Sequence, residues 1–160
     1  MKQLNKLQTI VLLSGAVLMV AGAGLYVFGT MLMASWIFLV GALCFASMQM
    51  MQTYSGNNFT IRRLRRIMVT GDVLFILSAL LMVENSYGLL LPLFLKLSPD
   101  GYFNYVTYVH NNWVLLLLVA AMLEIYTTHR ISGELAKEAK KTLKVSVFIL
   151  NCMKKFFLHR

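Results

Sequence analysis

The chain has 160 residues, of which 59% are hydrophobic and only 13% are charged, and its formal net charge is +9. One small water-soluble core cannot hide so much apolar surface, so this composition excludes an ordinary soluble domain. The basic residues stand in short blocks beside apolar runs, which is typical of membrane topology signals and argues against nucleic-acid binding.

The first two apolar runs cover residues 9–28 and 31–51, and neither contains a charged residue. A helix needs about 20 mostly apolar residues to cross the ~30 Å hydrocarbon layer. Within lipid, a short segment satisfies its own backbone hydrogen bonds only as a helix. Each run therefore predicts a transmembrane helix, and the short link at Gly29 predicts an antiparallel hairpin.

The start of the chain allows a second interpretation. Lys2 and Lys6, an apolar stretch and the small residues 21–23 resemble a signal peptide with a cleavage site. The apolar run nevertheless continues to Phe28, beyond that site, which favours a retained membrane helix.

Small residues recur at intervals of seven in these two runs. Because small side chains let helices approach closely, they predict a helix-packing groove. One hypothesis is that the groove joins the two helices of the hairpin, and the other is that it receives a helix of another protein. The residues are Gly15, Gly22 and Gly29 in the first run and Ala34 and Gly41 in the second.

Two further apolar runs cover residues 67–83 and 110–126, which completes a predicted transmembrane domain of four helices over residues 1–130. Residues 88–97 are apolar but too short to span the membrane, and Pro92 interrupts them. We expect a re-entrant or surface helix there.

The basic blocks predict the orientation of the chain. The link between spans two and three carries four arginines, and several lysines follow span four, whereas the link over residues 84–112 carries two acids and one base. Positive charge marks the cytoplasmic side, so we expect both termini inside, in a bacterial inner membrane. The arginines are also candidate contacts for anionic lipid headgroups. They are Arg62, Arg63, Arg65 and Arg66.

Residues 131–160 form a basic cytoplasmic tail. Residues 132–141 are rich in charge and predict an exposed helix. If residues 143–158 also form a helix, Lys144, Asn151 and Lys155 lie together on a narrow polar face. This pattern predicts an amphipathic helix lying in the headgroup region, and the alternative is a tail bound to a partner or disordered.

Asp72 and Glu124 are the only acids well inside the predicted spans. Each lies six residues from an arginine at its inner boundary, so in antiparallel helices they share one depth. Such acids face other helices and need partners. They form a candidate ion or proton site, unless nearby basic residues pair with them as structural ion pairs. The basic candidates are Arg65, Arg66, His129 and Arg130.

On the outer side, aromatic residues before span four predict an interfacial belt. His110, Asn111 and Asn112 stand among them, with Glu84 at a comparable level, and they define a candidate polar pocket.

No catalytic, nucleotide or metal-binding motif is found in the sequence, so we predict no enzyme and no cofactor. The two cysteines are far apart, and the Met-x-Met pairs of span two are ordinary packing residues for an apolar helix. We expect a small non-catalytic membrane subunit or scaffold that packs against lipid and other membrane proteins, or against itself. The alternative is a small transporter or ion-conducting protein that uses Asp72 and Glu124.

Overall fold

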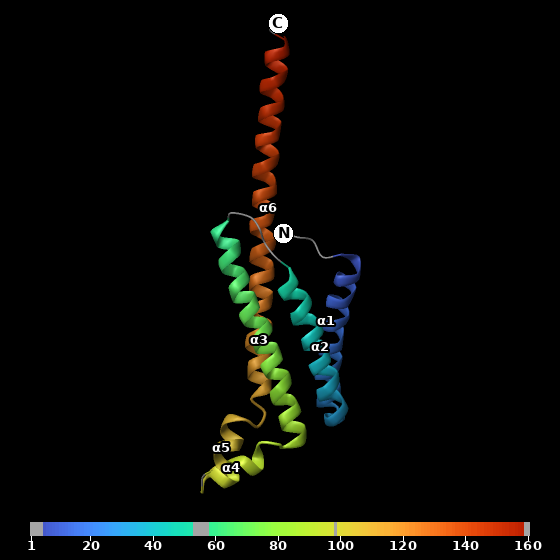
Figure 1. The fold of residues 1–160 in the computed structure, drawn as a ribbon, viewed down its shortest axis with the longest axis vertical. Coiled ribbons are helices and arrows are strands. Elements are labelled where there is room, and N and C mark those ends of the chain that lie inside the picture. The colour runs from blue at the N-terminus through green and yellow to red at the C-terminus, as the bar shows by residue number, and fades with distance from the viewer. Residues whose placement is uncertain (1–4, 53–57, 98, 159–160) are drawn as a thin grey trace.

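The computed structural model describes residues 5–52, 58–97 and 99–158, and these residues form helices joined by short turns, with no strand (Figure 1). The long helices are α1 (Lys6–Val27), α2 (Met31–Met51), α3 (Phe59–Tyr87) and α6 (Trp113–Leu158). Four helical stretches are long and apolar enough to cross a membrane: α1, α2, α3 and residues 101–147, which include the first part of α6. This confirms the predicted all-α class with four apolar helices of spanning length.

The four long helices form a row instead of a closed bundle. Among the described residues, the backbone of α1 packs on α2, α2 packs on α3, and α3 packs on α6. The backbone of α6 packs on neither α1 nor α2 within that same part of the chain. The short helices α4 (Leu91–Leu97) and α5 (Gly101–Tyr108) pack on each other.

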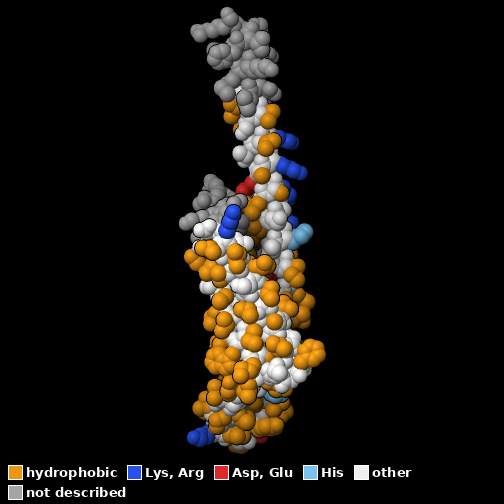
Figure 2. All heavy atoms as spheres, turned by 90° about the vertical axis from the view of Figure 1, so that its right-hand side faces the viewer, with side chains coloured by type: hydrophobic (Ala, Val, Ile, Leu, Met, Phe, Trp, Pro, Cys, Tyr) orange, Lys and Arg blue, Asp and Glu red, His pale blue; other side chains and the backbone are white. Residues whose placement is uncertain are grey.

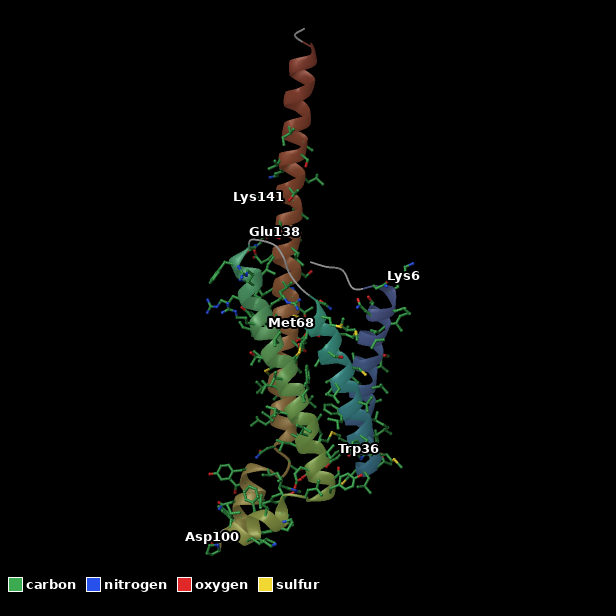
Figure 3. The ribbon with its side chains drawn as sticks, in the orientation of Figure 1. Lys6, Trp36, Met68, Asp100, Glu138 and Lys141 are labelled. Atoms are coloured by element: carbon green, nitrogen blue, oxygen red, sulfur yellow. The ribbon has the colours of Figure 1, made fainter. Side chains whose placement is uncertain are left out.

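The two ends of this row differ. The start of α1, the end of α2 and the start of α3 lie at one end, where α6 leaves the row and projects beyond it (Figure 1). We call this the basic end, because Lys6 and the arginines of α3 lie there. The α1–α2 turn, α4 and α5 lie at the opposite end, and Figure 3 shows Asp100 far from Lys6.

Local sequence sets several helix boundaries. The Asn5 side chain accepts a hydrogen bond from the Lys6 backbone N–H at 2.9 Å, and Asn58 accepts one from the Thr60 backbone N–H at 3.0 Å. Both are N-caps that satisfy otherwise unpaired N–H groups. Gly29 (φ +100°) and Gly88 (φ +63°) adopt backbone conformations that favour glycine, and they follow the ends of α1 and α3.

Three helices differ in extent from the sequence prediction. α3 begins at Phe59, so the arginine cluster lies on a helix instead of in a link, because arginine is a good helix former and no breaker separates the cap from the span. α4 begins at Leu91, whereas the sequence predicted a short helix from residue 88.

α6 also continues unbroken through the tail, in place of separate tail helices. No proline interrupts residues 127–158, so the helix has no reason to end. The side chains of Asn151 and Lys155, like Lys2, lie outside the described residues.

Candidate functional site

Three of the predicted groove glycines lie between α1 and α2. A Cβ added to Gly22 would stand 2.7 Å from the Phe38 backbone N, and one added to Gly41 would stand 2.8 Å from the Met19 backbone N. A Cβ on Gly15 would stand 3.1 Å from the Gly41 carbonyl oxygen. The two backbones therefore approach so closely that only glycine fits, and the internal hairpin uses these positions.

The other two groove residues behave differently. Ala34 is fully buried in the apolar core, in the first turn of α2. Gly29 lies in the turn after α1, and a Cβ there would meet nothing within 4 Å. Its seven-residue spacing is therefore unrelated to packing, and its positive φ explains the glycine.

Asp72 and Glu124 lie close together near the basic end, on α3 and α6. Asp72 is 0% exposed, and a Cβ on the preceding residue Gly71 would stand 3.7 Å from Glu124 Oε2. The Gln49 side-chain amide of α2 donates a hydrogen bond to Glu124 Oε1, and the Thr128 hydroxyl lies 3.3 Å from the same oxygen. We call Gln49, Arg65, Asp72, Glu124 and Thr128 the buried polar cluster.

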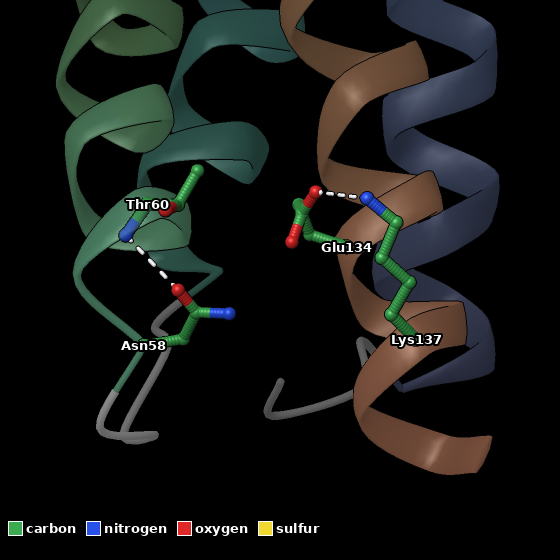
Figure 4. A network of polar contacts seen from close by, with 4 residues as sticks. All are labelled: Asn58, Thr60, Glu134 and Lys137. Carbon is green, nitrogen blue, oxygen red and sulfur yellow. Dashed lines mark hydrogen bonds and ion pairs between the residues drawn. The ribbon is translucent and has the colours of Figure 1, made fainter. Parts of the chain in front are cut away.

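Arg65 does not form an ion pair with either acid. Its Nη2 donates a hydrogen bond to the Gln49 carbonyl oxygen at 3.2 Å, which leaves Nη1 buried without a partner among the described residues. The structural ion pairs considered for Asp72 and Glu124 are therefore absent from the described residues. An ion pair elsewhere joins Glu134 and Lys137 at 2.8 Å, on the exposed part of α6 (Figure 4).

The other arginines of the cluster are exposed. Arg62, Arg63 and Arg66 line a shallow hollow of about 310 Å³ together with Phe59. Three guanidinium groups on one side of a helix end are suited to anionic groups such as lipid phosphates. Arg65 differs from them, since it is half-buried and points to α2.

A second polar group lies at the opposite end. Glu84 is buried and accepts hydrogen bonds from the Leu90 backbone N–H at 2.7 Å and from the Tyr105 hydroxyl at 3.3 Å. Asn85 donates to the Tyr26 hydroxyl at 2.6 Å and to Asn111 at 3.3 Å. These contacts tie α1, the turn before α4, α5 and the link before α6 to the end of α3.

The residues of the predicted outer pocket only partly meet there. Asn111 joins the Asn85 contacts, whereas the Asn112 side chain donates to the Thr107 carbonyl oxygen. The exposed His110 ring is tilted by 41° to the Tyr105 ring, with the ring centroids 6.5 Å apart. Glu84 is already occupied by backbone and tyrosine donors. The polar contacts described at this end fix the links between the helices.

Sequence reasoning missed two polar residues that organise these sites, Gln49 and Asn85. Gln49 is 2% exposed at the end of an otherwise apolar span. A buried amide needs a polar partner, so a glutamine within an apolar span could have been recognised in the sequence as part of a polar contact.

An apolar cleft separates α1 from α6, where the row of helices stays open. Its volume is about 330 Å³, and apolar side chains of all four long helices line it. Three of its residues are alanines, at positions 16, 23 and 121. Figure 2 shows hydrophobic side chains covering the outer face of the row, while lysine and arginine side chains follow the projecting part of α6.

The four apolar helices, the apolar outer face and the polar groups held inside suggest a multi-pass helical membrane protein. Comparison with protein-family models, curated proteins and solved structures finds no match to this chain.

Proposed function

We propose that this protein is a small, non-catalytic membrane subunit or scaffold that receives a transmembrane helix of another protein in the cleft between α1 and α6. The open cleft is the observation that carries the proposal. A closed four-helix bundle would fill this space, whereas here a cleft of about 330 Å³ remains between α1 and α6. Its alanines are half-buried, although Phe38 and Phe75 in its wall are already buried. Alanine lets a second helix approach closely, which is how helices associate in lipid.

The basic end supports a contact with anionic lipid as well. The exposed arginines of α3 and the lysines of the projecting α6 place positive charge at one end of the row, and each such residue contributes about 1 kcal/mol near an anionic surface. We therefore propose that the basic end faces the cytoplasm, with both termini there, across a plasma membrane.

The ion-conducting alternative has weaker support. A transport path needs polar groups through the membrane. The described polar contacts gather at the two ends, and an apolar core that includes Phe38, Phe75 and Ala79 lies between them.

Photocrosslinking tests the subunit proposal. A photoreactive phenylalanine analogue at Ala121 samples the cleft, and one at exposed Met122 samples the lipid-facing side of the same helix. We expect one reproducible membrane-protein adduct at position 121 that is absent at position 122. Substitution Ala23→Phe fills the cleft from α1 and should abolish copurification of that partner.

Lipid adducts alone at position 121 would contradict the proposal. An adduct with a second copy of the chain would show that the cleft joins copies of this protein in a homo-oligomer and does not bind another protein. A partner that still copurifies with the Ala23→Phe variant would show that the cleft is not its binding site.

A further inference from the structure

The buried polar cluster leaves three carboxylate oxygens without hydrogen-bond donors among the described residues. Both oxygens of Asp72 and the Oε2 atom of Glu124 are buried and unpartnered. Asp72 is 0% exposed, so bulk water does not reach it. Buried polar groups are normally satisfied, so these oxygens call for a positively polarised partner.

The close approach of α3 and α6 brings these oxygens to one level. A Cβ on Gly71 would stand 3.7 Å from Glu124 Oε2 and 3.6 Å from the Ala120 carbonyl oxygen. Asp72 is the next residue of α3 and is fully buried, so it lies at the same level of the helix pair as Glu124. Gln49 and Thr128 hold the other oxygen of Glu124 and so fix the orientation of that carboxylate.

Counted as ionised groups, Asp72 and Glu124 carry two negative charges and Arg65 carries one positive charge, and Arg65 already uses Nη2 on the Gln49 carbonyl oxygen. One monovalent cation or one proton would balance the cluster, whereas a divalent ion would bring one charge too many. No group of three or more His, Cys, Asp or Glu residues that could hold a metal ion is found in the described part of the chain, so a cation here would have these two carboxylates as its only charged ligands.

We propose that Asp72 and Glu124 bind one alkali cation between α3 and α6. The unpartnered acceptors of the cluster are all carboxylate oxygens, which are the ligands that hard cations prefer, whereas the unpartnered Arg65 Nη1 is a donor and cannot bind a cation. Gln49 and Thr128 position Glu124, and Arg65 limits the uptake to one charge. This site goes beyond the proposed subunit role, and its ligand is bound whether or not a partner helix occupies the cleft.

Equilibrium binding of radioactive ²²Na⁺ and ⁸⁶Rb⁺ tests the site. The full chain is placed in phosphatidylcholine nanodiscs without any partner, at fixed pH, with choline chloride keeping the ionic strength constant. We expect saturable binding of at least one of the two cations to the unmodified chain, and no saturable binding to Asp72→Asn or Glu124→Gln. The matched control is Glu84→Gln, which changes a buried acid that already has donors and should keep full binding.

Gln49→Leu provides a second route if either acid variant fails to fold. It retains both carboxylates but removes the donor that orients Glu124, and the loss of such an orienting partner weakens metal sites about tenfold or more.

Absence of saturable binding to the unmodified chain would overturn the proposal, and so would binding that survives in both acid variants. Proton uptake by the chain without cation binding would also overturn it, because a shared proton would then supply the missing charge.

Discussion

The two helix pairs of this protein are joined by different means. α1 and α2 meet through glycines whose missing side chains let the backbones touch, and the contact contains no polar side-chain hydrogen bond between these helices among the described residues. α3 and α6 also approach closely, at Gly71, but they enclose two carboxylates with an arginine and a glutamine beside them. The hairpin is held by close backbone contact, whereas the second pair combines apolar packing with buried polar groups.

The largest effect is expected from the hairpin, for Gly22→Leu. The new side chain would start 2.7 Å from the Phe38 backbone N, and backbone atoms cannot move aside without separating the helices. We expect a loss of about 3 kcal/mol in the free energy of unfolding, the upper range for overpacking, measured by unfolding in detergent.

Gly24→Leu is the matched control, since a Cβ on Gly24 meets nothing within 4 Å. Equal destabilisation by the two substitutions would mean that α1 and α2 are not held by close backbone contact.

The next effect concerns the second pair and its link to α2. Gln49→Leu removes the amide donor from Glu124 and leaves a buried carboxylate oxygen with less support. We expect a loss of about 2 kcal/mol in unfolding free energy, because an unpaired buried acceptor is costly. Adding Glu124→Leu removes the unpaired group and should recover much of that loss, measured as a double-mutant cycle. Additive losses would contradict the coupling of these two residues.

A smaller effect is expected at the end of the row opposite the basic end, where Tyr26 of α1 contacts side chains of α3 and α6. Tyr26→Phe keeps the ring contact with Trp113, whose centroid lies 5.0 Å away, but removes the hydroxyl that accepts from Asn85. We expect a loss of about 1 kcal/mol in the unfolding free energy. Tyr102→Phe, at an exposed ring, should have no effect in the same assay.

The smallest effect is expected outside both pairs, for Lys137→Ala. The ion pair with Glu134 lies on the exposed part of α6, where solvent and salt screen it. The melting temperature should not change measurably at low or high salt. A clear drop would show that the projecting part of α6 contributes to the folded row of helices.

Composition and run length predicted the four apolar helices, because a span requires about 20 apolar residues whatever their detailed packing. The spacing of Gly15, Gly22 and Gly41 predicted where two helices approach, but the same spacing misled at Gly29, which is a turn residue. Counting residues from Arg66 and Arg130 placed Asp72 and Glu124 at one depth, and in the structure Gly71, the residue before Asp72, lies against Glu124.

The partners of these acids were not predictable. Arg65 was expected to contact lipid or an acid, yet it donates to a backbone oxygen of α2. Gln49 and Glu124 are 75 residues apart, and their contact depends on how α2, α3 and α6 are placed relative to one another. The open side of the row was not predictable either. A helix face that contacts another helix and a face that contacts lipid are both apolar, so the sequence does not tell them apart.

α6 runs unbroken from the buried polar cluster to a point well beyond the basic end (Figure 1). The same helix carries Glu124 and reaches Leu158, a distance of about 50 Å at ~1.5 Å per residue. α6 stays packed on α3 as far as Ile131 and Leu135, so the part beyond Leu135 is the part that can tilt by itself, about 35 Å at ~1.5 Å per residue. A tilt of about 5° there would move Leu158 by about 3 Å, beyond the basic end.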